Sequence, residues 1–215
     1  MTSHGVRRLA ELGPRITLAP ERYRTERETS KGTSLSELVR EVRERLVPPP
    51  GGSVVVLDTT HVKDGLIDLP AARSSAALGA KWRVPPGALV VSRLRPYLRQ
   101  IGLASRGLFR SSRDLAEGVP LGCSTEFTVL VSSVEGESLA FLVPFLLSPP
   151  AQDFLAAGQE GGHHPRVPRE TLLSLQVPRD RARGRRDESR AVETAAERLY
   201  VTKERYREVL RLVPP

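Results

Sequence analysis

Residues 84–105 constrain the fold of this chain more than any other stretch of the sequence. They read VPPGALVVSRLRPYLRQIGLAS, in which a proline–glycine turn leads into an apolar run at 88–91 and a second apolar run follows at 101–104. Short apolar runs bounded by turn residues are typical of strands. Pro96 has a fixed φ, lacks an N–H group and pushes the residue before it toward extended geometry. The sequence therefore predicts two strands joined by an extended basic crossing.

The crossing carries three arginines at odd-numbered positions, Arg93, Arg95 and Arg99. Successive side chains of an extended chain point to opposite sides, so we expect the three arginines on one side. Because arginine is rarely buried without a partner, that side is expected to face solvent or a polyanion. The alternative is that Arg93 and Arg95 are structural and pair with Glu126 or with carbonyl groups at the strand ends.

The formal net charge of +8 is concentrated in one segment of the sequence. Between Leu69 and Arg113 there is no acidic residue, so the rest of the chain is close to neutral. The basic residues of this segment are Arg73, Lys81, Arg83, Arg93, Arg95, Arg99, Arg106, Arg110 and Arg113. Such a segment predicts a phosphate-contacting surface. The alternative is that arginines are scattered over a solvated face.

The composition indicates one substantial globular domain with an appendage. The chain has 215 residues, of which 39% are hydrophobic and 27% charged. Its single cysteine excludes an internal disulfide, and no Cys/His array has zinc spacing. Neither a signal peptide nor an apolar run long enough to span a membrane is present, so we expect a cytoplasmic protein.

The N-terminal part predicts a leader followed by a helix. Residues 1–33 read as an extended leader, and Ser34 and Glu37 have capping-box spacing. Apolar residues then recur at helical spacing up to Pro48: Leu35, Leu38, Val42 and Leu46. We expect a short amphipathic helix that packs on a sheet.

Further strands are expected at 53–57, 125–131 and 173–177. In the second of these, alternation places Thr125, Phe127, Val129 and Val131 on one face. A helix is expected to start at the prolines after Ser148, and residues 158–166 read as a polar loop. We therefore expect several short strands together with short helices.

Three sets of residues could suggest chemistry, but each is better explained by structure. Asp58 and His61 lack a third catalytic group, and we interpret them as the polar end of a buried strand. No motif supplies a base for Cys123, so it is expected in the core. His163 and His164 are adjacent and point apart, which favours a surface loop over a metal site. We expect no catalytic residues, no metal and no cofactor.

The C-terminal region predicts a linker and a helix. Residues 179–190, with six arginines and three acids, read as a solvated basic linker. From 191 to 213, spacings of three and four define a heptad seam: Val192, Ala195, Leu199, Thr202, Tyr206, Val209 and Val213. The seam is expected to dock a partner helix or to dimerise, and the alternative is a helix lying on its own domain.

Taken in order, these blocks resemble the specificity subunit of type I restriction-modification enzymes. The blocks are VVVLDTTHVKDGLI, VPPGALVVSRLRPYLRQIGLA, CSTEFTVLV, LAFLVPFLLSPPAQDFLAAGQEGGHHPR, and TLLSLQVP before the final helix. The resemblance implies one target-recognition domain over residues 34–178, so the chain looks like half of such a subunit. The fold class it implies is α+β, with a mixed, mostly antiparallel twisted sheet, short helices and a C-terminal heptad helix. It implies a non-catalytic protein that recognises double-stranded DNA for a separate methyltransferase or other defence subunit. After Pro178 the chain departs from the family, because the arginine-rich stretch replaces the usual start of the spacer helix.

The candidate DNA contacts divide into phosphate contacts and base readout. Phosphate contact is expected from Lys81, Arg93, Arg95 and Arg99, with Tyr97 beside them, and readout from irregular loops around Arg83, Arg106, Arg110, Arg113, His163, His164 and Arg166. Two alternatives remain at this point. One is a protein-interaction scaffold or regulator with little DNA binding, and the other is a small nuclease, which would need clustered carboxylates for a metal.

Overall fold

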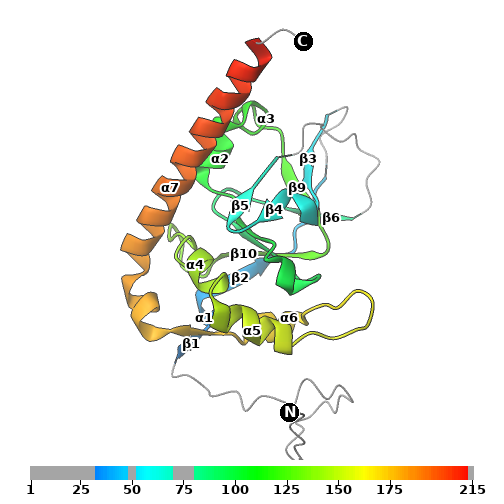
Figure 1. The fold of residues 1–215 in the computed structure, drawn as a ribbon, viewed down its shortest axis with the longest axis vertical. Helices are drawn as coiled ribbons and strands as arrows, with labels where there is room; N and C mark the ends of the chain where they lie inside the picture. The colour runs from blue at the N-terminus through cyan, green and yellow to red at the C-terminus, as the bar shows by residue number, and fades with distance from the viewer. Residues whose placement is uncertain (1–31, 48–51, 70–79, 213–215) are drawn as a thin grey trace, which may run out of the picture.

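The computed structural model describes residues 32–47, 52–69 and 80–212 (Figure 1). Its strands are β1 (Gly32–Ser34), β2 (Val39–Val42), β3 (Val55–Leu57), β4 (Val62–Lys63), β5 (Leu66–Ile67), β6 (Lys81–Arg83), β7 (Leu89–Ser92), β8 (Ile101–Leu103), β9 (Leu121–Ser124), β10 (Phe127–Ser132) and β11 (Gln176–Pro178). Its α-helices are α1 (Leu35–Leu38), α2 (Arg106–Ser111), α3 (Arg113–Ala116), α4 (Leu142–Leu146), α5 (Pro149–Ala157), α6 (Arg169–Leu173) and α7 (Arg179–Leu212), and its 3-10 turns are η3 (Thr59–His61) and η4 (Pro96–Leu98). The leader before residue 32, Arg73 and Val213 lie outside the described residues.

A four-stranded antiparallel sheet, in the order β2-β10-β7-β8, forms the centre of the molecule. The expected strand pair around the basic crossing is its β7–β8 hairpin, in which Leu89 pairs with Leu103 and Val91 with Ile101. A second sheet, β3-β9-β6, joins parallel and antiparallel pairs. Two-stranded ladders, β1–β11 and β4–β5, complete the pairing of the named strands. The α+β class and the mostly antiparallel pairing are confirmed.

The central sheet separates two hydrophobic cores. Leu89 and Val91 of β7 lie in one core with α1, α4 and α5, whereas Val90 lies in the other core with β3, β9 and α2. Alternation in β10 follows the same rule, since Phe127 and Val129 lie in the second core. Thus the face predicted for this strand is confirmed, and both sides of the sheet are covered.

The helix predicted over residues 35–46 is wrong after its first turn. The capping box is present, with the backbone N–H of Ser34 donating to Glu37 Oε1 at 3.0 Å. The helix ends at Leu38, however, and residues Val39–Val42 form β2 along β10. Val39 and Val42 are β-branched, and the ladder with β10 satisfies their backbone, so sheet pairing overrides helical spacing.

The linker predicted at residues 179–190 is also wrong, because α7 is continuous from Arg179 to Leu212. Arginine, glutamate and alanine are good helix formers. Side chains of the first turns also bind the domain: Arg185 Nη2 donates to Glu137 Oε1 at 2.9 Å, and the buried Ser189 hydroxyl accepts from the Phe141 N–H at 3.2 Å. This stretch is therefore an anchored part of the helix.

Helix α7 lies along one side of the domain, against α2 (Figure 1). Gly107 of α2 makes this close approach possible, because a Cβ atom there would lie 3.0 Å from the Cα and Cβ atoms of Glu197. The exposed loop between α5 and α6 projects on the side away from α7 (Figure 1). The long helix and this loop therefore lie on different sides of the domain.

Candidate nucleic-acid interface

The basic segment does not form one continuous surface. Arg106 and Arg110 lie on α2, and Arg113 lies on α3, so these residues are on helices beside α7 and not in irregular loops (Figure 1). Acids from elsewhere also neutralise several of the arginines. These ion pairs are Arg83–Glu44 at 2.7 Å, Arg99–Asp64 at 3.0 Å, Arg110–Glu197 at 2.8 Å and Arg113–Glu117 at 3.0 Å. The expectation of a single ridge without carboxylates is therefore wrong.

A smaller group of cations does gather, around the turn η4. The crossing is not extended: Pro96, Tyr97 and Leu98 form a 3-10 turn, with the Leu98 N–H donating to the Arg95 carbonyl at 2.9 Å. Arg95 and Arg99, at its two ends, adopt left-handed conformations with φ of 48° and 54°. Left-handed backbone is costly for residues other than glycine, so surrounding contacts must hold these two positions.

Backbone hydrogen bonds join three distant segments at this turn. The Arg93 N–H donates to the Glu126 carbonyl at 3.0 Å, and the Val167 N–H donates to the Arg93 carbonyl at 2.9 Å. The Arg95 N–H donates to the Pro165 carbonyl at 2.9 Å. The SRLRPYL block, the STEF block and the polar loop, which are far apart in the sequence, therefore form one surface.

One bidentate ion pair fixes the side chains of this surface. Arg166 Nη2 lies 2.7 Å from Glu126 Oε1, and Arg166 Nε lies 2.9 Å from Glu126 Oε2. Hydrogen bonds from the guanidinium group lower the pKa of Glu126, and the charges of Arg166, Arg93 and His164 act in the same direction. In turn, Glu126 raises the pKa of Arg166. The carboxylate thus holds the loop in place while several cations surround it.

Arg93 and Arg95 have different environments. Arg93 Nη2 donates to the Thr125 carbonyl at 3.4 Å, one of the structural contacts considered above. Arg95 Nη2 lies 3.2 Å from Nδ1 of the exposed His164. Neither guanidinium forms an ion pair with a carboxylate of the described residues, so neither is bound by an acid from the domain itself.

Other predicted contacts lie around this group. Tyr97 is 58% exposed, and His163 is exposed in the surface loop. Lys81 pairs with Ser124 across β6 and β9, so β6 begins beside the STEF turn. We call Lys81, Arg93, Arg95, Arg99, His163, His164 and Arg166 the η4 cluster. Sequence reasoning missed Asp64, because it meets Arg99 only through a tertiary contact. It named Glu126 as an acidic partner of Arg93 or Arg95, whereas the structure pairs Glu126 with Arg166.

The predicted seam of α7 is not the face that packs on the domain. Val192 contacts the first core, but Leu199 is 36% exposed, Tyr206 64% and Val209 57%; Ala195 and Thr202 are exposed too. Ala196 and Tyr200 face inward instead and are buried. The helix thus lies on its own domain and still leaves most of the predicted seam uncovered within the described residues.

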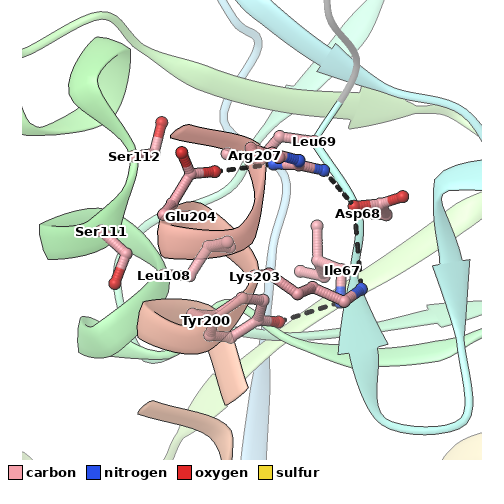
Figure 2. A pocket seen from close by; sticks show the side chains of 10 residues that line it. All are labelled: Ile67, Asp68, Leu69, Leu108, Ser111, Ser112, Tyr200, Lys203, Glu204 and Arg207. Carbon is pink, nitrogen blue, oxygen red and sulfur yellow. Dashed lines mark hydrogen bonds and ion pairs between the residues drawn. The ribbon is translucent and has the colours of Figure 1, made fainter. Parts of the chain in front are cut away.

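Polar contacts around Tyr200 fix the C-terminal half of α7 (Figure 2). The Ile67 N–H donates to the Tyr200 hydroxyl at 3.0 Å, and Arg207 Nη2 lies 2.9 Å from Asp68 Oδ1. Arg207 also contacts Glu204 at 2.7 Å, beside a small cavity of about 20 Å³. Burial raises the pKa of Tyr200, so the phenol stays protonated. These hydrogen bonds and ion pairs hold α7 against the domain, so we assign the groups a structural role.

The remaining candidates for chemistry have structural roles, as expected. The Asp58 N–H donates to Nδ1 of His61 at 2.9 Å, which caps the η3 turn after β3. Cys123 is buried in β9, and burial raises the pKa of its thiol to about 12. In the described ranges, no three His, Cys, Asp or Glu side chains form a group that could hold a metal ion. None of the helices in those ranges is long and apolar enough to cross a membrane.

Comparisons with known proteins reveal similarity only at the level of structure. No protein-family model matches the chain, and a search of curated proteins finds no match either. Among solved structures, a chain from a study of complex assembly and conformational transition of the type I R-M system has a TM-score of 0.53 and 21% identity. The match covers 85% of this chain and 45% of the other.

A second match is the HsdS subunit from Thermoanaerobacter tengcongensis, with a TM-score of 0.48, 20% identity, and coverage of 84% of this chain and 43% of that subunit. The chain spans less than half the length of either match. The resemblance predicted from the sequence is confirmed as a shared fold, which is the fold of a type I R-M system chain.

Proposed function

We propose that this chain is a non-catalytic, sequence-specific double-stranded DNA recognition domain that directs a separate methyltransferase, restriction or other defence subunit to its site. On this proposal it acts in the cytoplasm, and its own residues supply position and not chemistry. The shared fold and the ordered sequence blocks favour a specificity subunit over an unrelated basic protein.

The observation that carries the proposal is the η4 cluster. Three segments far apart in the sequence bring cations together around a turn held by backbone hydrogen bonds. Arg93 and Arg95 have no ion pair with a described carboxylate, and Arg99 keeps Nη1 and Nη2 beyond its contact through Nε with Asp64. Phosphate groups are the natural ligands of such guanidinium groups, because charge-assisted hydrogen bonds to them are strong.

Roles within the η4 cluster follow from the hydrogen bonds and ion pairs that each side chain already makes within the protein. Arg95, Arg99 and Lys81 are proposed to contact phosphates, which would fix the register of the domain on the duplex. His163 and His164 project from the exposed loop and are proposed to read bases. Arg166 donates through Nε and Nη2 to Glu126, so we assign it to holding this loop.

The helix α7 is proposed to bind the catalytic partner on its uncovered face. Leu199, Tyr206 and Val209 supply apolar contacts there. The exposed Arg198 and Arg205 flank this face and form no ion pair within the described residues. Two copies of the helix would bring like charges together at the flanking positions of the seam. A partner helix with acidic flanking residues therefore fits better than a second copy of this chain.

Salt-dependent binding tests the DNA proposal directly. Labelled duplexes are titrated with the full chain, and binding is followed by fluorescence anisotropy at several salt concentrations. The three proposed phosphate contacts predict a loss of affinity of roughly 40-fold between ~50 and ~200 mM salt. The double variant Arg95→Ala/Arg99→Ala should bind more weakly with a smaller slope. Absence of binding, or binding without salt dependence, would contradict the proposal.

A protein-interaction scaffold is the second candidate function, and the uncovered face of α7 is the observation that favours it. A scaffold would bind its protein partner through α7 and would show no affinity for a duplex in the anisotropy experiment. Arg95→Ala/Arg99→Ala would then leave every measured interaction unchanged. The same titration therefore distinguishes the two functions.

A further inference from the structure

The tip of the η4 turn presents apolar side chains in the middle of a cationic surface. Tyr97 is 58% exposed and Leu98 is 40% exposed, and the left-handed Arg95 and Arg99 stand directly before and after the turn. A surface that only contacts phosphates gains nothing from exposing two adjacent apolar side chains. Two adjacent apolar side chains at the tip of a turn are available for contact with another molecule.

This tip is held rigidly. Pro96 is buried at its base, and α5 packs against the turn. On one side the Arg95 N–H donates to the Pro165 carbonyl at 2.9 Å, and on the other the Asp64 N–H donates to the Arg99 carbonyl at 3.2 Å. Strained backbone persists only where surrounding structure holds it, and such positions cluster at functional sites. The apolar pair is therefore presented in a fixed position.

The cations around the tip select its ligand. Arg95 and Arg99 flank the apolar pair within five consecutive residues, and His164 lies against Arg95. An apolar protein surface would not favour this ring of charge, whereas a nucleic acid offers phosphates around stacked bases. Proteins that kink DNA insert apolar wedges between base steps and contact the neighbouring phosphates with basic residues. A tyrosine ring can also stack on an exposed base.

We propose that Tyr97 and Leu98 form a wedge that partly unstacks one base step of the bound duplex, while Arg95 and Arg99 contact the phosphates beside that step. This inference rests on the proposed DNA-binding function and adds that the domain deforms its duplex. The domain would then favour duplexes that have an easily deformed base step at the wedge, although no side chain reads that step by hydrogen bonding.

Binding to a deformed duplex tests the wedge. The full chain is titrated with a labelled duplex and with the same duplex carrying a single-nucleotide bulge, with 2-aminopurine next to the bulge. Because the bulge removes part of the unstacking cost, the wild-type chain should bind it about tenfold more tightly. Insertion should also increase 2-aminopurine fluorescence. In Tyr97→Ser/Leu98→Ser both effects should disappear, while the salt dependence on the intact duplex stays the same.

Val134→Ser is the matched control, because Val134 is 46% exposed and lies in the turn after β10, outside the η4 turn. It should leave the preference and the fluorescence unchanged, and thermal melting should show that each variant is folded. Equal affinity of the wild type for both duplexes, or a preference that survives in Tyr97→Ser/Leu98→Ser, would overturn the wedge and leave DNA binding intact. Absence of salt-dependent binding to either duplex would overturn both proposals.

Discussion

The guanidinium group of Arg166 forms a bidentate ion pair with the carboxylate of Glu126, with N–O distances of 2.7 and 2.9 Å. These residues are 40 positions apart, and the pair joins the polar loop to the turn between β9 and β10. Glu126 also accepts a backbone hydrogen bond, through its carbonyl oxygen, from Arg93. Glu126 therefore holds the η4 cluster together through both its carboxylate and its backbone carbonyl.

The Arg166–Glu126 pair should make the polar loop sensitive to acid. The pKa of Glu126 is lowered from its ordinary value of 4.5 in the folded chain, so the pair stabilises the fold fully above that value. This stabilisation is lost as the pH falls through the lowered pKa. NMR of backbone amides in residues 158–166 should show a transition below pH 4.5. Glu126→Gln should remove the transition, and a transition that persists in this variant would contradict the assignment.

Arg99→Ala should weaken binding to all duplex sequences by a similar factor. Arg99 is assigned to a phosphate, so its loss should reduce the slope of log K against log salt by about one. Arg113→Ala is the control from the same basic segment, because Arg113 lies on α3 and outside the η4 cluster. Anisotropy titrations across salt concentrations measure both variants. If Arg113→Ala lowered the slope as much as Arg99→Ala did, the η4 cluster would not be the binding surface.

Tyr200→Phe should destabilise the chain by about 1–3 kcal/mol, because it leaves the buried N–H of Ile67 without an acceptor. Tyr206→Phe is the matched control on the same helix, since Tyr206 is 64% exposed. The free energy of unfolding is measured by urea denaturation. Equal stability of the two variants would show that the hydroxyl of Tyr200 does not hold α7 on the domain.

The thiol of Cys123 should be inert in the folded protein. Burial raises its pKa to about 12, so almost no thiolate is present near neutral pH. A colorimetric thiol reagent should react slowly with the native chain and rapidly after urea unfolding. Rapid reaction of the folded chain would place the sulfur at the surface, contrary to its position in β9.

The uncovered face of α7 should bind a partner without contributing to the fold. Leu199→Ser/Tyr206→Ser should leave the melting temperature nearly unchanged, since both side chains are exposed. The same variant should lose affinity for the methyltransferase subunit that we propose as the partner of this chain. A pull-down with purified proteins measures this loss. Sedimentation velocity should show the wild-type chain alone as a monomer. A dimer that these substitutions dissociate would show that a second copy occupies this face.

The sequence by itself determined the elements whose signals are local. The strands β7 and β8 follow from apolar runs bounded by turn residues, and the first turn of α1 follows from the capping box. Alternation in β10 correctly placed Phe127, Val129 and Val131 on one face, whereas Thr125 lies in the turn before the strand. These features depend on neighbours in the sequence, so backbone propensity and side-chain period are sufficient to predict them.

The tertiary structure decided which charges meet and which faces are covered. Asp64 reaches Arg99, and Glu197 reaches Arg110, only because the fold brings distant segments into contact. On α7 both Ala196–Tyr200 and Leu199–Tyr206 have seam spacing, and the fit of Gly107 against Glu197 selects the first pair for the domain. Ion pairs and helix docking depend on contacts between segments that are far apart in the sequence. A local sequence pattern therefore does not determine which acid meets a given arginine, or which face of α7 meets the domain.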